Sequence, residues 1–280
     1  MNVPATSGLI VDWVIERAVP IGKKGFVVAV SGGVDSAVVS TIAAKSALEV
    51  KCLMLPIHQR QEESDRGMEH CKQLAAHYPN VTYNICDLTK MFEDAKEAVE
   101  EDFLVPNDSA AYPNLRSRIR MGIIYTFANA LDYLVLGTGN RIEDCKGIGF
   151  FTKYGDGGVD ISPIGNMTKT QVYELAKHLQ VPMSIQKAAP TDGIWEDGRT
   201  DEDQIGATYK ELEAAMEFCE DFGMNTFAEY IDKSIKLAGA PHYREHHKRV
   251  TPSALQIYLQ RHMANAHKMQ MPPIGPEAVV

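Results

Sequence analysis

One short stretch of the sequence combines residue types that bind anions with a single carboxylate. Residues 31–36 read Ser-Gly-Gly-Val-Asp-Ser. The two glycines let the backbone approach a ligand without a Cβ in the way, and the serine hydroxyls are hydrogen-bond donors. If a helix starts here, its unpaired N–H groups and the positive end of its dipole favour an anion such as phosphate. The stretch therefore predicts a phosphate-binding loop.

The neighbouring residues predict a strand before this loop and a helix after it. Residues 26–30 are apolar, and an apolar, Ala-rich segment runs from the loop to Leu48. No lysine follows the glycines as in a Walker loop, and the G-x-G-x-x-G dinucleotide fingerprint is absent. The simplest alternative is an ordinary strand–turn–helix in which a serine caps the helix.

A second polar loop follows another apolar run. Gly137-Thr138-Gly139-Asn140 comes directly after residues 133–136, with Glu143 and Asp144 just beyond. Asp35 and one of these carboxylates could share Mg²⁺, which binds few carboxylates together with phosphate oxygens and water. Spacing alone fits a solvated acidic loop equally well. A third loop, residues 149–160, carries Lys153, Asp156 and Asp160 among glycines that allow tight folding round a ligand.

The hydrophobic pattern predicts an α/β fold. Strands are expected at 26–30, 52–57, 81–85 and 133–137, with helices at 8–18, 61–78, 88–103 and 114–130. Strands that alternate with helices imply a doubly wound parallel sheet covered by helices on both faces. We expect a single domain over residues 1–268 and a flexible C-terminal tail over residues 269–280, where three prolines occur.

Composition narrows the class of protein. The net charge of −9 argues against a nucleic-acid partner, and no apolar run is long enough to span a membrane. Five cysteines without a C-x-x-C pair favour reduced thiols, and no secretory signal is visible. These features predict a cytoplasmic protein with neither a nucleic-acid nor a membrane partner.

The motifs then resemble a known family. Residues 31–36 resemble the pyrophosphate-binding loop of the ATP pyrophosphatases, which split ATP between its α and β phosphates. Residues 150–158, Phe-Phe-Thr-Lys-Tyr-Gly-Asp-Gly-Gly, closely resemble the ammonia-adding NAD synthetases. Similar stretches occur at 114–121, 163–171, 189–191, 200–206 and 246–249, so the likeness covers about residues 25 to 255. The chain departs from the family's common pattern at Ile142, where a small hydroxyl residue is common. It also departs in Pro190-Thr191-Asp192-Gly193-Ile194-Trp195, where Pro-Ser-Ala-Gly-Leu-Trp is common.

The resemblance implies a role for each matching residue. ATP would contact Ser31, Gly32, Gly33, Val34, Asp35, Ser36, Thr138, Lys169 and Thr191. Mg²⁺ would be held by Asp35 and Glu143. Deamido-NAD would contact Arg118, Lys153, Asp160, His247 and Lys248. Asp35 and Lys169 would act at the phosphates, and Asp156 would accept a proton from ammonia. Without the resemblance, Arg118 and Lys248 read as surface charges.

The implied reaction is the last step of NAD biosynthesis. ATP, deamido-NAD and ammonia would give NAD, AMP and pyrophosphate through an adenylated nicotinate carboxylate. Two alternatives stay open: a GMP-synthetase-like ammonia ligase acting on XMP, and a non-catalytic adenine-nucleotide-binding module. The family also implies a homodimer, and the apolar helix at 114–130 is the candidate interface.

Overall fold

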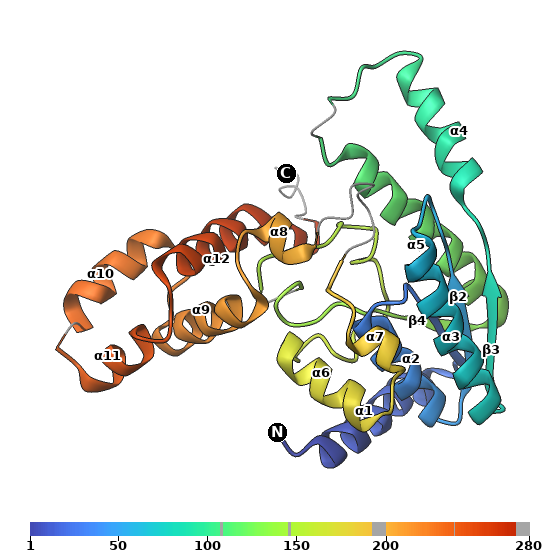
Figure 1. The fold of residues 1–280 in the computed structure, drawn as a ribbon, viewed down its shortest axis with the longest axis horizontal. Helices are drawn as coiled ribbons and strands as arrows, with labels where there is room; N and C mark the ends of the chain where they lie inside the picture. The colour runs from blue at the N-terminus through green and yellow to red at the C-terminus, as the bar shows by residue number, and fades with distance from the viewer. Residues whose placement is uncertain (107–108, 145–146, 192–199, 238, 273–280) are drawn as a thin grey trace, which may run out of the picture.

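A computed structural model describes residues 1–106, 109–144, 147–191, 200–237 and 239–272 (Figure 1). The predicted strands are confirmed, with slightly different ends. They are β1 (Gly25–Ala29), β2 (Glu49–Met54), β3 (Val81–Ile85) and β4 (Tyr133–Leu136). Within the described residues they form one parallel sheet in the order β3-β2-β1-β4. The chain moves outward from β1 to β3 and then returns to the far side of β1 for β4. The topological switch point therefore lies between β1 and β4.

Helices cover both faces of the sheet, as predicted. One face packs against α1 (Val3–Ala18), α2 (Val34–Lys45), α3 (Gln61–His77) and α6 (Lys169–His178). The other face packs against α4 (Thr89–Glu100) and α5 (Ala111–Leu131). Phe26 and Val28 of β1 face the first layer, whereas Val27 faces the second, because successive side chains of a strand alternate between faces. The doubly wound α/β fold is confirmed.

A helical lobe follows the sheet and has a hydrophobic core of its own. Its helices are α8 (Asp201–Ile205), α9 (Tyr209–Phe222), α10 (Phe227–Leu237), α11 (Pro241–His247) and α12 (Pro252–Asn265). Two residues from the loop after β4, Ile142 and Ile148, are buried in this core. Figure 1 shows α9, α10, α11 and α12 extending away from the sheet, with α6 and the short α7 (Met183–Gln186) between lobe and sheet. A separate core in this part of the chain was not predicted from the sequence.

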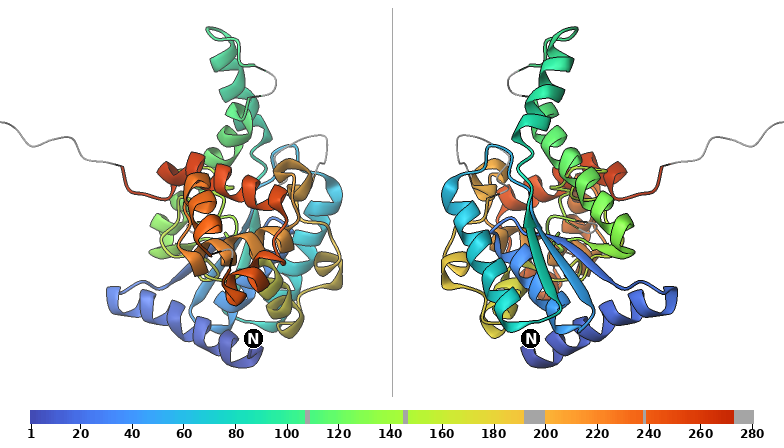
Figure 2. Two further views of the ribbon diagram at one scale, coloured as in Figure 1. Left: turned by 90° about the vertical axis from the view of Figure 1, so that its left-hand side faces the viewer. Right: turned by 90° about the vertical axis from the view of Figure 1, so that its right-hand side faces the viewer.

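α4 and the first turns of α5 project from the body of the protein, as Figure 2 shows. In α5 the side chains of Arg116, Ser117 and Ala128 are buried, and the others are partly buried or exposed. Among the described residues, no helix has the length and hydropathy that a bilayer-crossing segment requires.

His70 of α3 is a buried polar residue that contacts α2. Its Nε2 lies 2.9 Å from Oγ of Ser40, and the Ser40 hydroxyl donates to the carbonyl of Ser36 at 2.7 Å. The hydrogen-bond network therefore assigns the proton to Nε2, which leaves a neutral ring. Burial lowers the pKa of His70 to about 4.

This burial predicts a loss of stability in mild acid. Between pH 6.5 and 4, His70 is protonated in the unfolded chain but stays neutral in the folded chain. The free energy of unfolding therefore falls as the pH drops from 6.5 toward 4. We expect about 2 kcal/mol of the free energy of unfolding to be lost between pH 7 and 5 through this residue. In urea titrations His70→Gln should flatten this dependence, and His77→Gln, an exposed change on the same helix, should not. An unchanged pH dependence in His70→Gln would contradict the assignment.

Candidate active site

The loop after β1 is held in shape by its own serines. Ser36 Oγ accepts from the Ser31 backbone N–H at 3.2 Å and donates to the Gly33 carbonyl at 3.0 Å. Ser31 Oγ accepts from the Gly33 N–H at 3.2 Å. Gly32 has a φ of +86°, and a Cβ there would lie 2.3 Å from the carbonyl oxygen of Glu63 in α3. The first glycine is therefore required both by its conformation and by the close approach of α3.

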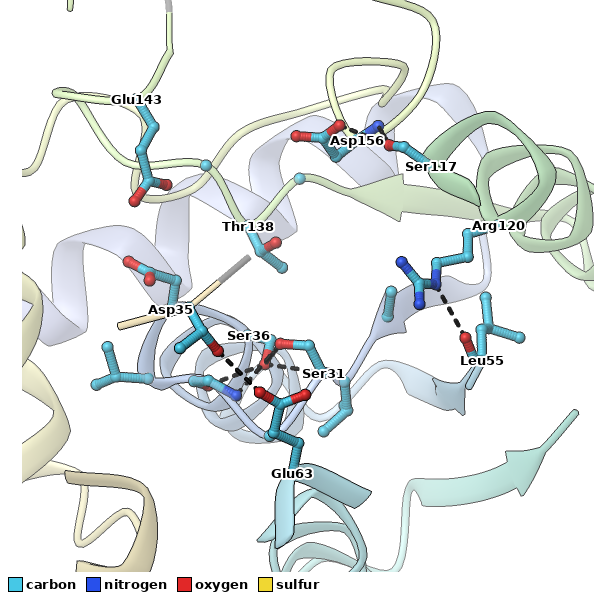
Figure 3. Close-up of a pocket in the computed structure, with 18 of the residues that line it drawn as sticks. Ser31, Asp35, Ser36, Leu55, Glu63, Ser117, Arg120, Thr138, Glu143 and Asp156 are labelled. Carbon is cyan, nitrogen blue, oxygen red and sulfur yellow. Dashed lines mark hydrogen bonds between the residues drawn. The ribbon is translucent and has the colours of Figure 1, made fainter. Parts of the chain in front are cut away.

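A pocket opens at the carboxyl ends of β1 and β4, at the switch point (Figure 3). All of the residues predicted to contact ATP line it: Ser31, Gly32, Gly33, Val34, Asp35, Ser36, Thr138, Lys169 and Thr191. Glu143 and Asp156 line it as well. The structure thus brings together side chains from the loop after β1, the loop after β4 and the start of α6.

The centre of this site is a buried group of charges. Lys169 is only 4% exposed, and its Nζ lies 2.5 Å from Oδ2 of Asp35 and 3.1 Å from Oε1 of Glu143. The ammonium also lies 4.7 Å from the centre of the Tyr209 ring. Lys169 is the first residue of α6, so the capping box of Thr168 and Gln171 fixes the point from which its side chain starts.

The pKa values of this group follow from burial and charge. Burial alone lowers the pKa of Lys169, but the carboxylates of Asp35 and Glu143 outweigh it and raise the pKa above its ordinary value. Burial raises the pKa of Asp35, while the Lys169 ammonium opposes that rise. Lys169 is therefore a permanent cation, and the site is adapted to hold a cation between two acidic groups.

A second layer orients the carboxylates and was not predicted from the sequence. Tyr209 donates to Glu143 at 2.5 Å and lies 3.0 Å from Asp201. The amide of Asn140 donates to Asp35 at 3.3 Å, and its oxygen accepts from the backbone N–H of Glu143 at 3.3 Å. Asn140 is part of the quoted Gly-Thr-Gly-Asn stretch, but Tyr209 and Asp201 gave no sequence signal of a site. In the acidic run at 201–203, Asp203 forms the capping box of α8 with Thr200.

The carboxylates of Asp35 and Glu143 fit a divalent cation. The described residues contain no group of three or more His, Cys, Asp or Glu side chains placed to hold a metal. Two carboxylates on one cation is nonetheless a set that suits Mg²⁺, which takes its remaining ligands from phosphates and water. Both carboxylates already converge on the ammonium of Lys169, so they can face a common positive charge.

Asp156 enters the pocket from the third loop. Its Oδ1 accepts from the Ser117 hydroxyl at 2.6 Å and from the Thr152 N–H at 2.9 Å. Burial raises the pKa of Asp156, although these two hydrogen bonds oppose the rise. In Figure 3, Thr138 lies between Asp156 and Asp35. A carboxylate with a raised pKa is a better proton acceptor than an ordinary one.

The residues predicted to bind the second substrate do not line this pocket. Arg118 is exposed on α5. Asp160 accepts from the Val135 N–H at 2.8 Å and from the Tyr125 hydroxyl at 3.1 Å, which joins β4 to α5. His247 contacts Tyr230 in the helical lobe, and Lys248 follows it at the end of α11.

Lys153 is engaged by the C-terminal segment. Its Nζ donates to the carbonyls of His267 and Gln270 at 2.7 and 3.0 Å. The first residues of the expected tail, 269–272, are therefore described and contact the body, while residues 273–280 lie outside the described part of the chain. A second His-Lys pair, His267-Lys268, thus lies beside the Lys153 loop. Its repetition of the dipeptide at 247–248 is the signal that could have found it.

Other lining residues also went unnoticed in the sequence. Glu63 is buried and accepts from the Thr191 hydroxyl at 2.9 Å, which links α3 to the loop before α8. Arg120 lies two positions after Arg118 in the quoted Arg-x-Arg stretch. Its Nε donates to the Leu55 carbonyl at 2.9 Å and its guanidinium reaches Gln59 at 3.1 Å. One side of the helix therefore faces the pocket, and Arg118 is on the other.

Because burial raises the pKa of Asp156, we expect its ionised carboxylate to lower the stability of the folded protein at neutral pH. The pKa of Asp156 is higher in the folded chain than in the unfolded chain. Its contribution to the free energy of unfolding is therefore fully present at low pH and is lost as the pH rises through the folded-state pKa. Asp156→Asn keeps an oxygen for Ser117 and Thr152 but cannot ionise. In urea unfolding we expect the variant to be at least as stable as the parent at pH 8, with a smaller difference at pH 5. Asp94→Asn, at an exposed ion pair on α4, is the control.

Lys169 should be essential to the stability of the site. Lys169→Met leaves two mostly buried carboxylates facing each other, and removing one partner from a buried ion pair costs about 3–5 kcal/mol. The deficit should shrink in acid as Asp35, whose pKa is raised by burial, takes up a proton, and adding Asp35→Asn should recover part of it. The measurement is the free energy of unfolding at several pH values. A single variant of near-parental stability at neutral pH would contradict this account.

Comparisons with known proteins place this geometry in a family. Residues 8–272 match the family model described as NAD synthase. The chain is 34% identical to the NH(3)-dependent NAD(+) synthetase of Methanococcoides burtonii, over 98% of this chain and 96% of that protein. It is 38% identical to the protein of the same name from Carboxydothermus hydrogenoformans, over 73% of this chain and 81% of the relative.

A solved structure agrees over nearly the whole length of the chain. The NMN synthetase from Francisella tularensis matches with a TM-score of 0.79 and 28% identity, covering 98% of this chain and 99% of that one. The nucleotide loop, the buried lysine and the surrounding fold therefore occur together in a chain that belongs to the NAD synthase family.

Proposed function

We propose that this protein joins ammonia to the nicotinate carboxylate of deamido-NAD at the expense of ATP, giving NAD, AMP and pyrophosphate. The observation that carries the proposal is the buried Lys169 between Asp35 and Glu143, beside a phosphate-type loop at the switch point. The names of the relatives from Methanococcoides burtonii and Carboxydothermus hydrogenoformans support the same reaction.

The first half of the reaction activates a poor acyl donor. An oxygen of the nicotinate carboxylate attacks the α-phosphorus of ATP, and the bond to the β-phosphate bridging oxygen breaks. Pyrophosphate leaves and an acyl-adenylate remains. Negative charge grows on the departing pyrophosphate, where the loop N–H groups and the Lys169 ammonium can stabilise it. Thr191 lines the same pocket, and its hydroxyl would have to turn away from Glu63 to donate a hydrogen bond to the phosphates.

The second half needs ammonia in its neutral form, because ammonium has no lone pair. Ammonia attacks the acyl carbon, the bond to AMP breaks, and the amide nitrogen loses a proton. Asp156 is the proposed acceptor of that proton, since its carboxylate lines the pocket and burial raises its pKa. Ser117 and the Thr152 N–H hold Oδ1, which orients the carboxyl group.

A magnesium ion is the proposed partner of the nucleotide. Asp35 and Glu143 would hold it, and bound there it would neutralise charge on the ATP phosphates. With Asp35 and Glu143 engaged by the ion, the Lys169 ammonium would be available to bind the phosphates.

The alternatives from the sequence are not favoured. The matched relatives are NAD synthetases rather than GMP synthetases, and the third loop keeps the Lys153 to Asp160 stretch that the XMP reading leaves without a role. A non-catalytic nucleotide-binding module has no need of a buried Lys169 held by two carboxylates.

A mononucleotide is a second candidate acceptor. The Francisella tularensis relative is named an NMN synthetase and matches this chain from end to end. The residues predicted to contact deamido-NAD lie outside the pocket. The reacting nicotinate group of either acceptor would bind inside it. Nicotinate mononucleotide carries the same reacting carboxylate without the adenylyl half, so it would require fewer contacts.

Assembly and location also remain proposals. A homodimer through α5 is supported by its partly buried apolar residues, Met121, Ile123, Ile124, Tyr125 and Phe127. Arg118 is exposed on the same helix, so its side chain could contact a second copy of the chain. Residence in the cytoplasm is supported by the free cysteines Cys52, Cys71, Cys86 and Cys219.

One assay tests the proposal. Pyrophosphate release is followed with ATP, Mg²⁺ and ammonium at pH 8, with deamido-NAD, nicotinate mononucleotide or XMP as the acceptor. We expect release with one or both nicotinate acceptors and none with XMP, because the pocket is proposed to serve the pyridine carboxylate. Asp35→Asn should reduce the rate at least a hundredfold, since it removes charge from both the lysine and the metal.

The controls separate the possible failures. Asp94→Asn is an exposed carboxylate change on α4 and should leave the rate unchanged. Release with XMP would restore the GMP-synthetase reading. No release with any acceptor, from a folded protein that still binds ATP, would favour the binding module.

A further inference from the structure

The first half of α3 lies directly against the nucleotide loop, residues 31–36 (Figure 3). The carbonyl oxygen of Glu63 is the atom that a Cβ at Gly32 would meet at 2.3 Å. One turn later, a Cβ at Gly67 would lie 3.4 Å from the Gly32 nitrogen. Between these two contacts, Nε of Arg66 donates to the Gly32 carbonyl at 3.4 Å. The packing of α3 therefore fixes the point beside the loop from which the Arg66 side chain starts.

Arg66 lines the pocket without a carboxylate partner among the described residues. Helical spacing would let it pair with Glu63 or Glu69, each three positions away on α3. Glu63 pairs with Arg60 instead, and Glu69 accepts from the Ser184 hydroxyl at 2.5 Å. Since Nε donates to the loop, the two terminal amino groups of the guanidinium keep their hydrogen-bond donors for a ligand.

The pocket carries more acidic than basic side chains. Those contributed by the described residues are the carboxylates of Asp35, Glu63, Glu143, Asp144, Asp156 and Asp201 and the cations Arg66, Arg120 and Lys169. Lys169 is held between two of the carboxylates. Arg120 donates to the Leu55 carbonyl and to Gln59. ATP adds several negative charges to this surplus, and Arg66 is placed to compensate them beside the loop itself.

A guanidinium in this place suits a phosphate group. The nucleotide loop leads into the N-terminus of α2, where backbone N–H groups and the helix dipole favour phosphates. A phosphate bound there lies beside Gly32, which Arg66 already contacts. The planar fork of a guanidinium can donate two parallel hydrogen bonds to phosphate oxygens, which a single ammonium cannot reproduce.

We propose that Arg66 binds the β- and γ-phosphates of ATP and stays on the pyrophosphate as it leaves, which makes it a catalytic residue of the adenylation step. The kinetic part of this inference rests on the proposed function. When the bond between the α-phosphorus and the bridging oxygen breaks, the oxygen keeps the electron pair and the pyrophosphate gains negative charge. Hydrogen bonds from the guanidinium become stronger as that charge develops, so they accelerate the step.

The binding test needs no acceptor. Inorganic pyrophosphate, ATP and AMP, each with Mg²⁺, are titrated by calorimetry into Arg66→Met, which keeps most of the apolar stem. We expect pyrophosphate and ATP to bind roughly tenfold or more weakly than to the parent, and AMP within about twofold, because AMP lacks the two phosphates. Arg66→Lys should recover part of the loss. Lys72→Met removes an equal charge from an exposed position on the same helix and should change none of the three affinities.

The kinetic test isolates adenylation. Exchange of labelled pyrophosphate into ATP is measured with the acceptor present and ammonia absent. For Arg66→Met we expect the exchange rate at saturating ATP to fall roughly tenfold or more, because the guanidinium acts on the departing group. The apparent affinity for the acceptor should stay within about twofold of the parent, since the acceptor contributes no β- or γ-phosphate.

The outcomes separate this role from two others. Equal weakening of pyrophosphate, ATP and AMP overturns the proposal, since Arg66 would then only support the loop through Gly32. Weaker acceptor binding with unchanged ATP binding overturns it as well, because the guanidinium would then serve the second substrate. Unchanged pyrophosphate binding, or a parent that binds none, also contradicts it. A parent without activity toward any acceptor refutes the proposed function, and the titrations still decide the role of Arg66.

Discussion

Lys169 can lie almost out of solvent only because Asp35 and Glu143 both converge on its ammonium. A buried unpaired lysine would lose its proton, and two buried carboxylates alone would repel each other. The three groups are contributed by three different segments, α2, the loop after β4 and α6. The nucleotide loop, the second loop and the first turn of α6 must therefore be brought into register together. The parallel sheet achieves this by ending β1 and β4 at the same edge.

Much of this arrangement could be predicted from local sequence. The strand–glycine–helix pattern at residues 26–48 located the nucleotide loop, because a short-range turn depends on neighbouring residues. Asp35, Glu143 and Lys169 were found by motif, and all three line one pocket. The same motif comparison placed the second substrate on His247 and Lys248, which lie in the helical lobe and not in that pocket. These roles remain untested predictions.

The rest of the site depends on contacts between segments far apart in the chain. Tyr209 donates to Glu143 across 66 residues, and Thr191 donates to Glu63 across 128. Neither pair has a local spacing that a sequence pattern could reveal. The same holds for Lys268 and Phe151, which meet across 117 residues. Arg118 and Arg120 illustrate a smaller difficulty: both belong to one motif, but helical periodicity turns only Arg120 toward the pocket.

Ile142 and Ile148 anchor the loop after β4 in the core of the helical lobe, beside the pocket at the carboxyl ends of β1 and β4. Glu143 follows Ile142 immediately, and the Ile148 N–H returns to the Ile142 carbonyl at 2.8 Å, so this short loop is closed between two anchors in the lobe core. Any subglobal opening that exposes the lobe core releases Glu143 while the sheet remains folded. The position of Glu143 therefore depends on the stability of the lobe core as well as on that of the sheet.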